Sequence, residues 1–155
     1  MREYTIYLVG QISDNIETYN WRKNVIQELK DYENVRIINP CNSEFNRTIE
    51  GDKDLFAKWQ RVATANLLVP KDRNHVKESD CILANLNLYS PDKPLIGSLY
   101  ELAWAYDQSH TMVIGIANEE LGNSYILNHP FIRQSIDILA RDEYQACELI
   151  KNVLD

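Results

Sequence analysis

The sequence has little glycine, only five residues in 155, and none of it forms a phosphate-binding loop. Gly10 ends the first apolar stretch without the further glycines of a G-x-G-x-x-G motif or a P-loop. Cysteine is also scarce, since Cys41, Cys81 and Cys147 are odd in number, far apart and without CxxC or Cys/His spacing. We therefore expect reduced cysteines in a cytoplasmic protein, with no disulfide framework, no metal and no cofactor.

Positive charge and long apolar runs are lacking as well. Sixteen Lys and Arg against 23 Asp and Glu give a net charge of -7, which disfavours a nucleic-acid polymer as partner. No run approaches the roughly 18 apolar residues of a membrane span, and the start MREYTIYLVG is too short and too polar for a signal peptide. We expect no membrane partner, whereas a small anionic ligand stays compatible with the charge, because a helix N-terminus can hold one.

The chain alternates apolar stretches with helical periodicity and predicts one α/β domain, 1–155. The expected strands are 4–9, 35–39, 81–86, 111–117 and 136–140, and the expected helices are 19–29, 52–67, 98–108 and the segment after Asp142. Pro70 is expected to end a helical segment before a charged connection at 71–79, and 118–135 is expected to be rich in loops. Because the strands are continuous apolar runs, they predict a parallel sheet covered on both faces. Five strands favour a flavodoxin-like, doubly wound sheet of order 2-1-3-4-5.

This strand order predicts where a ligand binds. The chain reverses direction between the first and third strands, and ligands bind at the carboxyl edge of such a reversal. The loops at that edge are 10–14 and 87–98. The predicted site neighbourhood is therefore Gly10, Gln11, Asn85, Asn87, Gly97, Ser98 and Glu101.

Glu101 has two interpretations. Ser98 and Glu101 match the S-x-x-E capping box, in which the glutamate only caps its own helix, and spacing alone favours this interpretation. Alternatively, Glu101 is a carboxylate nucleophile that the helix dipole keeps ionised at neutral pH. Such a carboxylate can attack an anomeric carbon and form a covalent glycosyl-enzyme.

Other polar residues carry weaker signals. Asp72 is either a solvated turn residue or a group that donates a proton or hydrogen bond to a leaving heterocycle. Tyr7 is either a core tyrosine or a residue that orients the nucleophile. The pair Trp21-Arg22 is more typical of a packed Trp beside a solvated Arg. The three histidines, His75, His110 and His129, lack metal-site or triad spacing.

Several motifs together resemble a known family. They are YTIYLVG at 4–10, WRKNVIQEL at 21–29, INP at 38–40, VPKD followed by SDCILANL within 69–86, and GSLYELAWAY at 97–106, with HPF at 129–131. In this order they resemble the nucleoside 2-deoxyribosyltransferase family and its nucleotide N-glycosidase relatives. The resemblance spans about 130 positions; each motif is loose alone, and the ordered set is moderately specific.

The resemblance implies a role for three residues. Glu101 occupies the position of the glutamate that attacks C1′ of the deoxyribose in the family. Tyr7 occupies the position of the tyrosine that hydrogen-bonds this glutamate. Asp72 occupies the position of the aspartate that contacts the base. The implied reaction has two steps, in which Glu101 displaces the base and a second base or water then attacks the deoxyribosyl-enzyme. The implied partners are a small nucleoside or nucleotide and a free nucleobase, and the implied assembly is a homo-oligomer.

One position departs from the family pattern. Six residues before the nucleophile the transferases carry an aspartate and the nucleotide hydrolases a serine, whereas this chain has Leu95. Asp92, three residues upstream, is the candidate replacement. Three functions are therefore open: transfer of deoxyribose between bases, hydrolysis of deoxynucleoside 5′-monophosphates, and nucleotide binding without catalysis, in which Glu101 would be only a cap.

Overall fold

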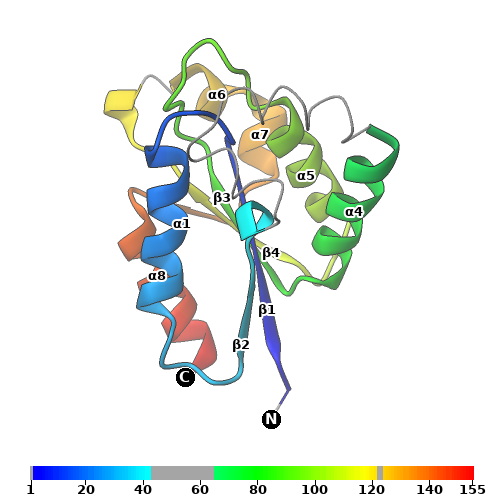
Figure 1. The fold of residues 1–155 in the computed structure, drawn as a ribbon, viewed down its shortest axis with the longest axis vertical. Helices are drawn as coiled ribbons and strands as arrows, with labels where there is room; N and C mark the ends of the chain where they lie inside the picture. Colours follow the sequence, from blue (N-terminus) through cyan, green and yellow to red (C-terminus); the bar gives the residue numbers. More distant parts are fainter. Residues whose placement is uncertain (1, 43–64, 122–123) are drawn as a thin grey trace.

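The computed structural model describes residues 2–42, 65–121 and 124–155, and it contains a five-stranded sheet (Figure 1). The strands are β1 (Tyr4–Gly10), β2 (Val35–Ile38), β3 (Cys81–Asn85), β4 (Met112–Ile116) and β5 (Ile138–Ala140). All four pairings are parallel and the order is β2-β1-β3-β4-β5. The predicted flavodoxin-like sheet and its strand order are confirmed.

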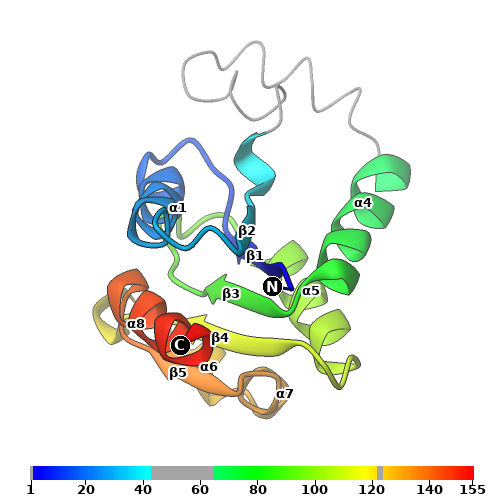
Figure 2. The same ribbon diagram turned by 90° about the horizontal axis from the view of Figure 1, so that it is seen from below.

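Helices cover both faces of this sheet (Figure 2). One face carries α1 (Glu17–Glu28) and α8 (Glu143–Leu154), and the other carries α4 (Ala65–Glu78) and α5 (Ile96–Tyr106). The shorter elements are η1 (Pro40–Asn42), η2 (Glu119–Leu121), α6 (Ser124–Asn128) and α7 (Pro130–Gln134). Asp142 begins α8 as predicted, because its Oδ1 accepts a 2.8 Å hydrogen bond from the Gln145 amide.

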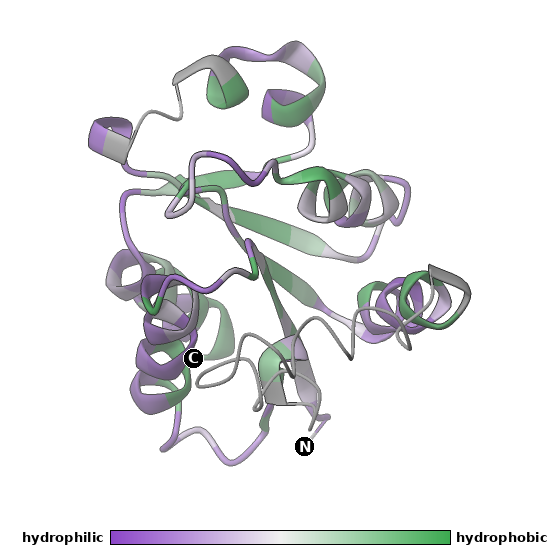
Figure 3. Cartoon of the chain, turned by 45° about the horizontal axis from the view of Figure 1, so that its top comes forward, coloured by the Kyte–Doolittle hydropathy of each residue, from purple (hydrophilic) through white to green (hydrophobic). Residues whose placement is uncertain are grey.

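Strand β1 distributes its side chains between the two cores. Ile6 and Leu8 pack in the core beneath α1 and α8, whereas Tyr7 and Val9 pack in the core beneath α4 and α5. This alternation follows from the two-residue period of a strand. Figure 3 shows the strands as hydrophobic, as expected for a sheet buried on both sides. Tyr7 therefore points to the same side as helices α4 and α5.

Helix α4 corrects the prediction that Pro70 ends a helix. The helix continues through Pro70 and includes the segment that we expected to be a charged connection. A proline inside a helix costs about 3 kcal/mol because it removes a hydrogen bond and crowds the preceding turn. Val76, which is fully buried in the core, anchors the second half of the helix, so packing outweighs this cost. Most of the predicted helix 52–67 lies outside the described residues.

Two further boundaries differ from prediction. Helix α5 begins at Ile96, two residues before the expected start, with Leu95 as a cap residue that makes no side-chain hydrogen bond. The segment 118–135, expected to be rich in loops, contains α6 and α7. Pro130 lies at the first turn of α7, where its missing N–H and fixed φ favour a helix start. The HPF sequence thus marks a helix N-terminus.

Candidate active site

A pocket of about 420 Å³ opens at the carboxyl end of β1. Its lining comes from β1 and the following loop, from α4, and from the loop and first turns of α5: Tyr7 to Ile12, Pro40, Leu68, Val69, Asp72, Lys93, Pro94, Leu95, Gly97, Ser98, Glu101 and Trp104. The pocket lies at the sheet edge that the strand order predicted. Of the predicted site residues it brings together Tyr7, Gly10, Gln11, Asp72, Gly97, Ser98 and Glu101.

Glu101 is held by a residue of the sheet. The Tyr7 hydroxyl donates a 2.7 Å hydrogen bond to Oε1 of Glu101. Because α5 begins at Ile96, Glu101 lies in the second turn of the helix, and Ser98 makes no capping hydrogen bond. The predicted helix start at Ser98, which would place Glu101 in the first turn, is wrong, and so is the capping-box interpretation. The carboxyl group is aimed at the pocket and at β1.

Burial controls the charge state of Glu101. Its side chain is buried, and this raises the pKa of its carboxyl group to about 8, with a further rise from the negative charge of Asp72. The hydrogen bond from Tyr7 and the positive charge of Arg22 lower the pKa but do not cancel the effect of burial. The expectation that the helix dipole keeps Glu101 ionised at neutral pH is therefore wrong. The anion becomes the main form only above about pH 8.

Tyr7 lies between two acidic groups. Burial, Glu101 and Asp72 all raise the pKa of the Tyr7 hydroxyl, so Tyr7 keeps its proton and donates it in the hydrogen bond to Glu101. Burial also raises the pKa of Asp72 on α4, against the opposing effects of Lys71, His75 and the Tyr7 hydroxyl. The pocket thus contains two carboxyl groups whose pKa values burial raises, and one of them, Glu101, accepts a hydrogen bond from Tyr7. This combination suits transfer of a proton to a leaving group.

His75 lies behind these groups, one helical turn after Asp72. Its ring meets the ring of Tyr7 edge to face, with 5.3 Å between centroids. Burial lowers the pKa of His75, and its Nδ1 has no hydrogen-bond partner among the described residues. Because His75 does not line the pocket, it contributes packing against Tyr7 and an electrostatic effect on Asp72.

Gln11 joins the two loops that border the pocket. Its Nε2 donates to the carbonyl oxygens of Ser90 at 2.8 Å and Lys93 at 2.6 Å, and its Oε1 accepts from the Ser90 amide at 2.9 Å. Asn15 adds a 2.8 Å hydrogen bond to the carbonyl of Tyr89. The Gln11 side chain therefore fixes the loop before α5 to the loop after β1.

Three predicted residues lie outside the pocket lining. Asn85 and Asn87 are buried at the carboxyl end of β3, where they hold loop backbone: Oδ1 of Asn85 accepts from the Asn87 amide at 3.0 Å, and Oδ1 of Asn87 accepts from the Asn118 amide at 2.8 Å. Leu95 lines the pocket at the position where the resemblance implies a polar residue. Asp92, the candidate replacement, is exposed and does not line the pocket.

Sequence reasoning missed the apolar wall of the pocket. Leu68 and Val69 lie one turn before Asp72 on α4, and Trp104 lies one turn after Glu101 on α5. Side chains three or four residues apart share a helix face, so this spacing was the signal that could have found them. A flat aromatic and aliphatic wall beside Asp72 is suited to a planar heterocycle.

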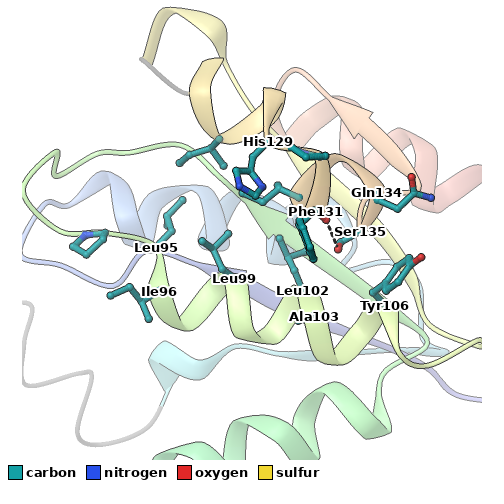
Figure 4. A pocket seen from close by; sticks show the side chains of 14 residues that line it. Leu95, Ile96, Leu99, Leu102, Ala103, Tyr106, His129, Phe131, Gln134 and Ser135 are labelled. Atoms are coloured by element: carbon teal, nitrogen blue, oxygen red, sulfur yellow. Dashed lines mark hydrogen bonds between the residues drawn. The ribbon is translucent and has the colours of Figure 1, made fainter.

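A larger pocket of about 810 Å³ lies between α5 and α7 (Figure 4). Its lining is dominated by apolar side chains, among them Leu99, Leu102 and Phe131, with His129 at its edge. It contains no carboxyl group, so it offers no carboxylate nucleophile of the kind that Glu101 offers in the smaller pocket. Its size therefore does not make it the better candidate for catalysis.

No three side chains of His, Cys, Asp or Glu gather as a metal site in the part of the chain that the structure describes. Over the same residues no helix is long and apolar enough to cross a membrane.

Comparison with known proteins finds similar structures but no similar sequences. No model of a known protein family matches the chain, and no curated protein matches it. A conserved protein from Enterococcus faecalis V583 superposes with a TM-score of 0.62 at 18% identity, covering 97% of this chain and 99% of that one. The CMP N-glycosidase BcmB of Clostridium botulinum superposes with a TM-score of 0.56 at 13% identity, covering 96% and 98%. A 2-desoxiribosyltransferase from Leishmania mexicana gives 0.56 at 18% identity, covering 96% and 97%. Over nearly its whole length, this chain therefore shares the fold of a deoxyribosyltransferase and of a nucleotide N-glycosidase.

Proposed function

We propose that this protein cleaves the N-glycosidic bond of 2′-deoxyribonucleosides through a covalent deoxyribosyl-Glu101 intermediate. The observation that carries the proposal is the hydrogen bond between Tyr7 and Glu101 at the edge of a pocket that also contains Asp72. The motif resemblance and the two structural neighbours named for cleaving or transferring at such bonds support the same reaction class. Glu101, Tyr7 and Asp72 are the catalytic residues in this proposal.

The first half of the reaction breaks the bond to the base. The ionised carboxylate of Glu101 forms a bond to C1′ while the C1′–N bond breaks and its electron pair moves to the base nitrogen. Asp72 donates its proton to the base as this happens, which its raised pKa favours. Tyr7 keeps Glu101 oriented by donating to Oε1, so the other oxygen is the attacking atom.

The second half reverses these roles. The nitrogen of another nucleobase, or a water molecule, attacks C1′ and displaces the Glu101 carboxylate. Asp72 accepts the proton of the incoming nucleophile and returns to its starting state. Transfer and hydrolysis thus differ only in which molecule occupies the space beside Leu68, Val69 and Trp104.

A hydrolase of deoxynucleoside 5′-monophosphates is the second candidate. Lys93 lines the pocket beside Gly97 and Ser98 at the N-terminal end of α5, and a positive charge there favours an anionic substrate. The named activity of the structural neighbour BcmB, a CMP N-glycosidase, supports the same alternative.

One experiment separates these functions. The protein is incubated with deoxynucleosides, deoxynucleotides and free bases, and the products are resolved by chromatography. New nucleosides without free sugar support the transferase, and sugar phosphate supports the nucleotide hydrolase. Glu101→Gln is the matched control, and intact-mass measurement of wild type with a slow substrate should show a deoxyribosyl adduct. Ligand binding without any product in wild type would contradict both enzymatic functions.

The resemblance also leads us to infer a homo-oligomer. The apolar pocket of Figure 4 carries Phe131, 79% exposed, and Tyr106, 59% exposed, on its rim. Exposed aromatic residues around an apolar groove are typical of protein contacts. Light scattering after size exclusion measures the mass directly, and a monomer at all concentrations would contradict the inference.

A further inference from the structure

Arg22 is a fully buried cation that the proposed reaction does not use. It lies on α1, on the opposite face of the sheet from Glu101, and none of its side chain is exposed. The guanidinium carbon lies 4.6 Å from the centroid of the Trp21 ring. A buried charge is costly unless other groups compensate it. Sequence reasoning expected Arg22 to be solvated, and the structure shows that this was wrong.

Backbone carbonyl groups supply most of the compensation. Nη2 of Arg22 donates to the carbonyl of Gly10 at 3.0 Å, and Nη1 donates to the carbonyls of Gln11, at 3.2 Å, and Thr18. Nε has no hydrogen-bond partner among the described residues. Gly10 and Gln11 are pocket residues, so the guanidinium touches the pocket wall from behind.

Gly10 permits this approach because it has no side chain. A Cβ atom at Gly10 would lie 3.0 Å from Cζ2 of Trp21 and 3.4 Å from Nη2 of Arg22, and 3.2 Å from the Asn85 carbonyl oxygen. The distances to Trp21 and to the Asn85 carbonyl are tighter than ordinary van der Waals contact, and the carbonyl oxygen is backbone that cannot move aside. The glycine that ends β1 therefore makes room for the Trp21–Arg22 pair and not for a dinucleotide phosphate.

The loop after β1 is connected by hydrogen bonds to the loop that leads to Glu101. The carbonyl of Gln11 is held by Arg22, and the Gln11 side chain holds the backbone of Ser90 and Lys93. Lys93 lies three residues before α5 begins at Ile96. A continuous set of hydrogen bonds thus runs from Arg22 to the loop that delivers Glu101.

The positive charge of Arg22 also lowers the pKa of Glu101. The groups that shift the pKa of the Glu101 carboxyl group are Tyr7 from β1, Asp72 from α4 and Arg22 from α1. Arg22 is the cation among these three groups. Burial lowers the pKa of the Arg22 guanidinium, and the smaller effects of Cys41, Tyr7, Glu101 and Tyr19 oppose this lowering. A buried site strengthens such interactions because little water screens them.

We propose that Arg22 is a positioning residue: its hydrogen bonds to the carbonyls of Gly10 and Gln11 fix the loop after β1 behind the pocket, and through Gln11 they fix the loop that leads to Glu101. The role as an aid to the reaction rests on the proposed function, whereas the effect on the charge of Glu101 does not. A purely structural arginine would support the fold and leave the titration of Glu101 unchanged.

The test compares Arg22→Met, Arg22→Gln and Arg22→Lys with wild type. The carboxyl carbon of Glu101 is followed by ¹³C NMR against pH, with Glu101→Gln used to assign its signal, and circular dichroism establishes which variants fold. The neutral variants should raise the pKa of Glu101, because an opposite charge is lost. Arg22→Lys should keep the pKa within about 0.3 units, since it keeps the charge.

Activity gives the second readout. In the neutral variants the acid limb of kcat/KM should move to higher pH by the same amount as the NMR titration. In Arg22→Lys kcat/KM should fall about tenfold without a shift of that limb, because an ammonium cannot span the carbonyls of Gly10 and Gln11 as a planar fork does. Arg22→Gln replaces Arg22→Met as the neutral variant if the latter does not fold.

Each failure has its own signature. An unchanged Glu101 titration in a folded neutral variant overturns the charge role of Arg22 whether or not the protein is an enzyme. Wild-type kcat/KM in Arg22→Lys overturns the positioning role. If wild type cleaves no nucleoside or nucleotide while the titration moves as expected, the proposed function fails and the effect of Arg22 on Glu101 stands.

Discussion

The Tyr7 hydroxyl and the Glu101 carboxyl oxygen Oε1 lie 2.7 Å apart although 94 residues separate them in the chain. Two periodicities produce this contact. Tyr7 points toward α5 because odd-numbered residues of β1 face the core beneath α4 and α5. Glu101 points toward β1 because it is buried on the inner face of α5 with Leu102 and Ala105. A side chain of the sheet, Tyr7, therefore orients the carboxyl group of the proposed nucleophile.

Tyr7→Phe tests this hold. The substitution keeps the ring against His75 and removes only the hydroxyl group. A hydrogen bond to a charged group contributes about 1.5–3 kcal/mol, so we expect kcat/KM to fall roughly 10- to 100-fold. The acid limb should also move to higher pH, because the hydrogen bond lowers the pKa of Glu101. Steady-state assays against pH measure both effects. Tyr4→Phe, on the other face of β1, is the control, and an equal loss there would argue against a specific role for Tyr7.

The pH dependence of the wild-type enzyme follows from the state of Glu101. Only the anion attacks C1′, and burial raises the pKa of this carboxyl group to about 8. For a nucleoside whose base leaves without protonation, so that Asp72 is not needed as an acid, we therefore expect log kcat/KM to rise with a slope of about one per pH unit below pH 8 and to level off above it. Initial rates from pH 5 to 9.5 provide the profile. A rate that is already constant from pH 5 upward would show that the reacting enzyme does not need this ionisation.

Glu101→Gln should stabilise the fold while it abolishes turnover. The pKa of Glu101 in the folded protein, about 8, lies above the ordinary value of 4.5. Its contribution to stability is therefore complete below about pH 4.5 and is lost as the pH rises toward 8. A neutral glutamine avoids this loss, so the variant should melt roughly 2–6 °C above wild type at pH 8 and with a smaller difference at pH 5. Thermal unfolding followed by circular dichroism at both pH values measures the difference.

Glu33→Gln is the control for that comparison, because Glu33 is exposed. Its melting temperature should follow wild type at both pH values. If Glu101→Gln does the same, the carboxyl group of Glu101 does not destabilise the folded protein, and the pH profile expected above loses its physical basis.

Asp72→Asn tests the proton donor. Asparagine keeps the hydrogen-bonding shape but cannot transfer a proton, and general acid catalysis contributes typically about 10²–10⁴ in rate. The loss should be largest for bases that leave poorly and small for a nucleoside whose base leaves without protonation. Comparing kcat for such a pair of substrates isolates the proton transfer. Asp107→Asn, an exposed residue at the end of α5, should retain wild-type rates. Equal losses for both substrates would show that Asp72 only binds.

The fold was predictable because each strand is a continuous apolar run. The pattern in residues 4–9 and 111–117 specifies strands buried on both faces, and alternation with helices then leaves few arrangements. The strand order placed the pocket at the carboxyl end of β1, and the structure puts Tyr7, Asp72 and Glu101 there. Those residues were nominated by local pattern and by resemblance.

The remaining features depend on contacts that no local pattern contains. The start of α5 at Ile96, which moves Glu101 out of the first turn, is set by the loop that Gln11 holds. The passage of α4 through Pro70 depends on the burial of Val76 in a core built from distant strands. Arg22 looked solvated because its acceptors are main-chain carbonyls, and these have no sequence signature. Backbone acceptors and long-range burial therefore account for the main errors.

Gln11→Leu tests whether the two loops need their connection. Leucine fills a similar volume but removes the three hydrogen bonds that Gln11 makes with the carbonyls of Ser90 and Lys93 and with the amide of Ser90. Three lost hydrogen bonds at about 0.5–1.5 kcal/mol each predict a loss of roughly 2–4 kcal/mol in the free energy of unfolding. KM should rise as well, since the same loops line the pocket. Urea unfolding and initial rates measure the two effects. Gln27→Leu on the exposed side of α1 should change the free energy by less than about 0.5 kcal/mol. Equal urea unfolding midpoints for the two variants would mean that the loops keep their positions without Gln11. The hydrogen bonds that connect Arg22 to the loop before α5 would then not help to position Glu101.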